Sequence, residues 1–195
     1  MPTFLLGLLF FTSPSIVGVD VLTPLIRLTL LGFICITTFF VPALGIYYLY
    51  RAGYVKSLHL DDLSDRKLPY FLTAFFYAFA TYFFSYQLAP LSEIAPEIGI
   101  ILGSITVSIA LVGLISLSWK ISAHGTGIGG FVGAVFGIAV KFSENNLLYP
   151  FLIFLVLGGM LVSARLQLNA HTPAQVGAGV FLGILVSLIT VWWFV

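Results

Sequence analysis

The chain has 195 residues, of which 60% are hydrophobic and only 8% are charged, and its formal net charge is +1. Soluble domains carry roughly a quarter of charged residues, so the composition excludes a soluble globular protein and predicts an integral membrane protein. A charge this close to zero gives no indication of a nucleic-acid partner. The single cysteine, Cys35, excludes a framework of intrachain disulfides.

Six apolar runs are long enough to be membrane-spanning helices, which need about 20 residues each. These runs are Leu28–Tyr50, Tyr70–Pro90, Ile98–Trp119, Thr126–Val140, Leu147–Ala164 and Ala174–Val195. The predicted fold is therefore all-α, a polytopic membrane helical bundle that forms one domain over residues 1–195 with its core in residues 28–195. An earlier apolar stretch, Pro2–Val19, is broken by Ser13, Pro14 and Ser15; it either forms a seventh segment, short or re-entrant, or does not enter the membrane.

Three polar interruptions between the runs fall on the same side of the membrane when the crossings are counted. They are residues 51–69, 120–125 and 165–173. The spans that follow the second and third interruptions carry glycines at intervals of four residues, which let helix backbones approach closely. These glycines are Gly129, Gly133, Gly137, Gly179 and Gly183. Close packing of the two spans predicts that the polar interruptions meet and bind one anion.

His171, in the third interruption, has several features of a reactive residue. Thr172 and Pro173 are suited to the cap and the first turn of the next helix, so His171 lies beside a helix N-terminus, where anions bind. Gln175 follows one turn later and can accept a hydrogen bond from one ring nitrogen, which exposes the other as a nucleophile. Arg165 offers a planar fork that matches two phosphate oxygens.

The other two interruptions supply further groups for the same anion. Ser122 can hold a phosphate oxygen while His124 protonates a leaving alcohol. Positive charge for the phosphate comes from Lys120, Arg66 and Lys67. Taken one by one, these cations can equally be interfacial anchors of helix ends, and each histidine can be an ordinary loop residue. Their grouping on one side of the membrane favours catalysis.

Two of these segments resemble signatures of the type 2 phosphatidic-acid phosphatase superfamily of membrane lipid phosphatases. That family has an Arg, five residues and a His, with an Asp four residues after the His; here the three positions hold Arg165, His171 and Gln175. Its Ser-Gly-His segment corresponds to residues 122–124, with Ala123 in place of the glycine. The resemblance covers the chain from about residue 51 to the end.

The third family signature, a Lys, six residues, an Arg and a Pro, is preserved least. His59 stands seven residues before Arg66, and Pro69 follows three residues after it rather than directly. The neighbouring Asp61, Asp62 and Asp65 do not have the spacing of an aspartate-rich metal box on a helix.

The resemblance implies that His171 is a nucleophile that forms a phosphohistidine and that His124 is the general acid. It implies that Arg165, Ser122 and Arg66 hold the phosphate, helped by Lys67 or Lys120. No metal or other cofactor is expected, because the cations supply the charge that a metal would. The expected substrate is a membrane lipid phosphate or diphosphate, such as phosphatidic acid, phosphatidylglycerol phosphate or a polyprenyl diphosphate, whose tail stays in the bilayer.

Two other functions remain open at this point. One is a non-catalytic protein that binds or moves an anionic lipid, and the other is a b-type haem protein with His124 and His171 as axial ligands. The resemblance favours a multi-pass protein of the bacterial plasma (inner) membrane with its active loops on the outer face. The excess of Lys and Arg on the loop side favours the cytoplasmic face instead. The sequence does not indicate an oligomeric state.

Overall fold

The computed structural model describes residues 2–58, 62–168 and 170–195, and in these ranges the chain forms helices and no strand. Within the described residues, six segments are long and apolar enough to cross a membrane. They are Pro24–Arg51, Asp65–Gln87, Pro96–Ile115, Ala123–Lys141, Asn145–Gln167 and Pro173–Phe194. The predicted all-α membrane bundle and its six spans are confirmed, with ends that differ from the predicted ones by a few residues.

The first two spans are continuous helices that contain one wide turn each. Helices α2 (Pro24–Cys35) and α3 (Val41–Arg51) are joined by a π-helical turn over Ile36–Phe40. Pro42 follows this turn directly; a proline cannot donate to the carbonyl four residues earlier and its ring crowds that carbonyl, so the wider turn accommodates it. Helix α4 (Leu63–Tyr82) likewise ends in a π-helical turn, before the short α5 (Ala89–Ile94).

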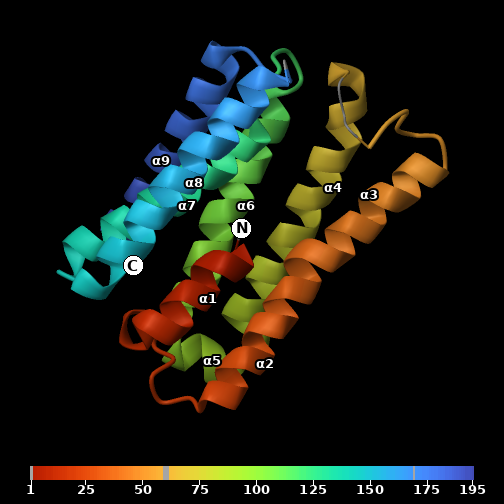
Figure 1. The fold of residues 1–195 in the computed structure, drawn as a ribbon. Helices are drawn as coiled ribbons and strands as arrows, with labels where there is room; N and C mark the ends of the chain where they lie inside the picture. Colours follow the sequence, from red (N-terminus) through yellow and green to blue (C-terminus); the bar gives the residue numbers. More distant parts are fainter. Residues whose placement is uncertain (1, 59–61, 169) are drawn as a thin grey trace.

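Helix α1 (Pro2–Thr12) does not cross the bundle. Its 11 residues span about 16 Å, whereas the hydrocarbon core of a bilayer is about 30 Å thick. Figure 1 shows its N-terminal end near the middle of the bundle and its other end at the lower rim. The Arg27 guanidinium donates hydrogen bonds of 3.0 Å to three carbonyls, including that of Phe10, and ties α1 to α2. The apolar stretch before the first span thus contains a short apolar helix that packs against the other helices.

The remaining helices are α6 (Pro96–Ile115), α7 (Ala123–Lys141), α8 (Leu148–Gln167) and α9 (Pro173–Phe194). Helices α7, α8 and α9 lie side by side in Figure 1. The predicted close packing of the glycine-bearing helices α7 and α9 is confirmed. A Cβ atom at Gly133 would lie 2.9 Å from the Ile184 Cα, so only glycine permits this approach.

Replacing Gly183 with alanine is expected to destabilise the protein by about 1–3 kcal/mol. The added Cβ would overlap the Thr126 carbonyl oxygen and the Gly130 nitrogen, which are backbone atoms and cannot rotate away. Gly177→Ala is the matched control on the same helix, because its Cβ would meet nothing within 4 Å. Thermal unfolding in detergent, followed by tryptophan fluorescence, measures the difference. Equal melting temperatures for the two variants would contradict the role assigned to this contact.

The three predicted polar interruptions lie at one end of the bundle. Figure 1 shows the connections α3–α4, α6–α7 and α8–α9 at its upper rim. Two hydrogen bonds join them: Arg66 Nη1 donates to the Ile121 carbonyl at 3.3 Å, and the His171 ring lies 3.2 Å from the Lys120 carbonyl. The prediction that these segments share one side is therefore confirmed.

Candidate active site

His171 sits directly before α9 and is only 7% exposed. The next residue, Thr172, caps the helix: its hydroxyl accepts from the Gln175 backbone N–H, while the Gln175 side chain accepts from the Thr172 N–H. This reciprocal capping box, with Pro173 in the first turn, fixes the backbone on both sides of the histidine. The backbone carbonyl of Gln175 accepts a hydrogen bond from the Ser122 backbone N–H at 3.2 Å. This bond joins the start of α9 to the start of α7.

The hydrogen bonds of the His171 ring determine which nitrogen carries the proton. Nδ1 lies 3.2 Å from the Lys120 carbonyl oxygen and 3.3 Å from Gln175 Oε1. The Gln175 atom must be the oxygen, because it also accepts the Thr172 N–H at 3.1 Å. Both neighbours of Nδ1 are therefore acceptors, so Nδ1 carries the proton and Nε2 keeps its lone pair. The predicted orientation of the ring by Gln175 is confirmed, and the Lys120 carbonyl is a second acceptor that sequence reasoning missed.

Arg66 and Lys67 diverge, although they are neighbours in α4. Arg66 is 4% exposed and reaches the Ile121 carbonyl, next to the site, whereas Lys67 is exposed. Successive side chains on a helix point about 100° apart, so only one of the two can face the bundle interior. Arg66 is thus the member of the pair that the fold brings to the site. The structure does not bring Lys67 into contact with His171.

Arg165 lies in the last turn of α8, six residues before His171. Its Nε atom is buried and makes no hydrogen bond within the described part of the chain. A buried guanidinium nitrogen without an acceptor costs free energy, and a bound anion removes that cost. The Arg165 charge acts on the His171 ring, on the His124 ring and on the Tyr70 phenol, so all three lie within electrostatic range of Arg165.

The Ser122 hydroxyl is fully buried and caps α7, accepting the Gly125 N–H at 3.1 Å. In this arrangement the hydroxyl acts as a helix cap, and its contact with a phosphate oxygen stays a prediction. His124 lies in the first turn of α7 and is exposed, within electrostatic range of both Arg66 and Arg165. The structure therefore brings the two predicted imidazoles to the same pair of guanidinium groups.

A hollow in the surface lies beside His171. Its lining comes from the α6–α7 connection and from the segment between α8 and α9. The lining residues are Lys120, Leu166, Ala170, His171, Thr172, Pro173 and Gln175. Lys120 thus lies beside His171, as predicted for a phosphate-binding residue. A ligand in the hollow has direct access to the segment that carries His171.

Tyr70 is a site residue that sequence reasoning missed. It lies one turn after Arg66 on α4, and the charges of Arg66 and Arg165 both act on its hydroxyl. It also lines a cavity inside the bundle. The four-residue spacing from Arg66 was the only available signal, since i and i+4 side chains share a helix face.

The pKa of His171 is lowered from its ordinary value of 6.5. Burial of the ring is the main cause, and the charge of Arg66 is the second. The hydrogen bonds to Gln175 and Lys120 oppose this shift, and the charge of Arg165 adds to it. The imidazole is therefore neutral at pH 7, which is the state that a nucleophilic nitrogen requires.

Two predictions fall on residues 59–61, outside the described residues: the departure from the family pattern at His59 and the spacing of the aspartate cluster that includes Asp61. In the described part of the cluster, Asp65 is buried and its carboxylate accepts the Lys56 backbone N–H at 3.2 Å. Asp65 thus stabilises the loop before α4.

Comparison of the chain with protein-family models, with curated proteins and with solved structures found no match.

Proposed function

We propose that this multi-pass membrane protein removes phosphate from a membrane lipid phosphate or diphosphate through a phosphohistidine at His171. The observation that carries the proposal is the pairing of two features at one rim of the bundle. One is an imidazole whose Nδ1 is held by two acceptors, and the other is a buried Arg165 Nε that lacks an acceptor among the described residues. Phosphoryl transfer requires a nucleophile together with a group that neutralises the phosphate oxygens.

The proposed reaction has two steps. In the first, the Nε2 lone pair of His171 forms a bond to phosphorus, the bond from phosphorus to the lipid oxygen breaks, and protonated His124 gives its proton to that oxygen. In the second, water attacks phosphorus, neutral His124 accepts its proton, and the phosphorus–nitrogen bond breaks. The products are inorganic phosphate and a lipid alcohol, or a lipid monophosphate when the substrate is a diphosphate. Arg165 and Arg66 neutralise the phosphate oxygens throughout.

A phosphate-release assay over a panel of lipid monophosphates and diphosphates tests this function. Purified protein in detergent is expected to release phosphate from at least one lipid, at the same rate with and without a chelator. Binding of a lipid phosphate without turnover would instead identify the non-catalytic anionic-lipid protein. An absorbance band of bound haem in the purified protein would identify the haem protein and contradict the proposal.

The membrane and the orientation belong to the same proposal. We place the protein in the plasma (inner) membrane with the His171 rim on the outer face. In this orientation Arg27 and Lys141 lie near the end that faces the inside of the cell. Both donate hydrogen bonds to backbone carbonyls and so act as structural residues at that end. Labelling of a cysteine introduced at Lys56, in a Cys35→Ala background and with a reagent that does not cross membranes, reports the face directly. Labelling only after cell lysis would reverse the assignment.

The acid limb of kcat/KM is expected below pH 6.5, because a lowered pKa keeps the His171 imidazole neutral into more acid solution. Arg66→Met removes a positive charge beside the ring, so the pKa rises and the limb moves to higher pH. Gln175→Leu removes a hydrogen bond that raises the pKa, so the limb moves to lower pH. Comparing variants on one substrate cancels the ionisation of the substrate itself. A limb at the same pH in all three proteins would show that the titrating group is not His171.

A further inference from the structure

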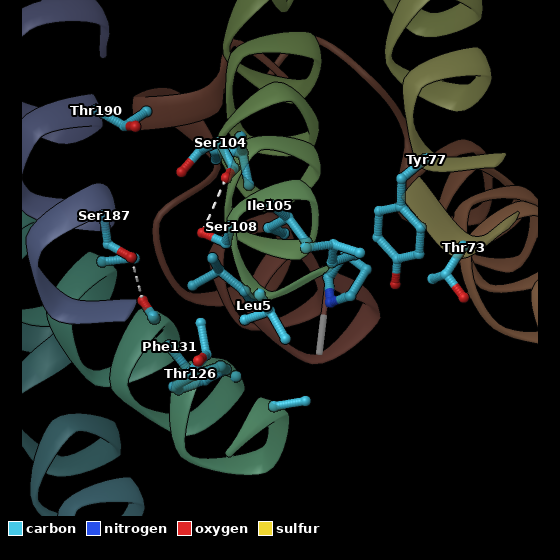
Figure 2. Close-up of a pocket in the computed structure, with 18 of the residues that line it drawn as sticks. Leu5, Thr73, Tyr77, Ser104, Ile105, Ser108, Thr126, Phe131, Ser187 and Thr190 are labelled. Carbon is cyan, nitrogen blue, oxygen red and sulfur yellow. Dashed lines mark hydrogen bonds between the residues drawn. The ribbon is translucent and has the colours of Figure 1, made fainter. Parts of the chain in front are cut away.

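A cavity of about 280 Å³ lies inside the bundle, lined by parts of α1, α3, α4, α6, α7 and α9. Figure 2 shows side chains from several helices around it. Along α7 its lining runs from Ala123 to Ile138, which is 15 residues or about 22 Å at the rise of an α-helix. The cavity therefore extends through most of the apolar thickness of the bundle.

The upper end of this cavity meets the candidate active site. Ala123 lies between Ser122 and His124 at the start of α7, and it lines the cavity. Tyr70 lines it too, while its hydroxyl lies within electrostatic range of Arg66 and Arg165. A molecule whose phosphate binds these cations thus has the cavity mouth directly beside it.

The chemistry of the lining favours an apolar occupant, even though several hydroxyl groups face the cavity (Figure 2). Most of these hydroxyls donate to backbone carbonyls of the surrounding helices. The bonds are Thr73 to Pro69 at 2.7 Å, Ser108 to Ser104 at 3.0 Å, Thr126 to Ser122 at 3.1 Å, Ser187 to Gly130 at 2.8 Å and Thr190 to Val186 at 2.9 Å. A hydroxyl that is satisfied in this way presents mainly carbon to the cavity and does not require a polar ligand.

Helix α1 contributes to the wall of the same cavity. Pro2 and Leu5 contribute to the lining, together with Ile101 and Ile138. Leu5 is 5% exposed, while its neighbour Leu6 is fully buried and does not line the cavity. Helix α1 therefore places one leucine in the cavity wall and the next in the core.

We propose that this cavity binds the hydrocarbon tail of the lipid phosphate, and that α1, through Leu5, limits the length of the tail. The proposal rests on the proposed function, because that function brings a phosphate lipid to the cavity mouth. An extended alkyl chain advances about 1.2 Å per bond, by analogy with an extended backbone, so about 22 Å corresponds to roughly 18 carbons. Longer tails would have to bend past Leu5 or leave the cavity.

A series of n-alkyl phosphates from 6 to about 22 carbons tests the length limit, with KM for phosphate release as the readout. Each methylene that enters the cavity is expected to lower KM about fourfold, and the gain stops near the limit. Because long chains also partition into detergent, the informative quantity is the ratio of variant to wild-type KM at each chain length. Leu5→Trp is expected to raise this ratio only for long chains, and Leu5→Ala to lower it only for chains beyond the wild-type limit.

Leu6→Ala is the matched control, since it removes the same atoms from the adjacent residue but leaves the cavity wall intact. The ratio of the Leu6→Ala KM to the wild-type KM is expected to be the same at every chain length. Ratios for the Leu5 variants that are equally flat would overturn the proposal, as would a control ratio that depends on length in the same way. The melting temperature of each variant separates a change in length preference from a loss of folded protein.

A binding arm keeps this inference separate from the proposed function. If no alkyl phosphate is hydrolysed, the function has failed, but alkyl phosphonates still report tail binding through a rise in melting temperature. The rise in melting temperature is then expected to grow with chain length up to the limit. In the Leu5 variants that limit is expected to shift. Alkanols of the same lengths test whether any bilayer chain occupies the cavity. Binding at least about tenfold weaker than the phosphonates supports a substrate tail, and equal binding overturns it.

Discussion

Replacement of His171 with alanine is expected to reduce phosphate release by on the order of 10⁴-fold or more, as removal of a nucleophile does in other enzymes. The variant loses the nitrogen that attacks phosphorus and keeps the cations that bind it. Substrate binding should therefore persist, with KM changed little. The substitution removes the two hydrogen bonds of the ring, to the Lys120 carbonyl and the Gln175 side chain. Each contributes only about 1 kcal/mol to stability, so the fold is expected to remain. Retention of activity by His171→Ala would exclude the phosphohistidine mechanism.

The phosphoenzyme itself can be trapped with a substrate labelled in the phosphate. Wild-type protein should carry acid-labile, base-stable label, as expected for a phosphorus–nitrogen bond, and His171→Ala should carry none. His124→Ala is the matched histidine control: it keeps the nucleophile and loses the general acid. Its rate of phosphoenzyme formation should fall strongly for an alkyl phosphate and much less for p-nitrophenyl phosphate, whose leaving group needs no proton. An equal loss on both substrates would remove the general-acid role from His124.

Replacement of Arg165 with methionine is expected to lower kcat/KM by about 10²–10³-fold, the usual cost of removing one donor to a transition-state anion. Its buried Nε has no hydrogen-bond acceptor in the described residues, and in the proposed function a phosphate oxygen supplies that acceptor. Arg165→Lys restores the charge without the planar fork and should recover only part of the activity. Arg51→Met is the control, because Arg51 is an exposed cation on the same side of the bundle.

Arg165→Met is expected to leave the melting temperature of the protein unchanged or to raise it. The buried Arg165 Nε has no acceptor among the described residues, so its removal costs no hydrogen bond there and a bound anion would supply the missing acceptor. Inorganic phosphate should therefore stabilise wild-type protein by mass action and stabilise Arg165→Met much less. A large fall in melting temperature on Arg165→Met, without an effect on phosphate binding, would show that this arginine is a structural residue only.

The local arrangement around His171 was predictable because it depends on near neighbours in the chain. Thr172, Pro173 and Gln175 favour one capping box, and that box sets both the backbone and the side-chain amide beside the ring. The shared side of the three polar segments was predictable for a different reason. Lipid requires each apolar run to be a complete helix, so the number of spans alone determines which loops lie together.

The rotation of each helix about its axis could not be read from the sequence. In a soluble helix the apolar stripe identifies the inward face, but here the residues that face lipid are as apolar as those that face the bundle. Three features of the site therefore emerge only from packing. They are the divergence of Arg66 from Lys67, the position of Tyr70 and the second acceptor at the Lys120 carbonyl.

By itself, the sequence determined a six-span helical membrane protein and the residues able to do phosphate chemistry on one side of it. Length and hydropathy suffice for that, because a bilayer accepts very few backbone structures. Tertiary structure decided how α1 packs against the other helices, and that a cavity lined by Ala123, Tyr70 and Leu5 lies between them. A cavity is the space that several helices jointly fail to fill, so it depends on their crossings and side-chain volumes together and on no single segment.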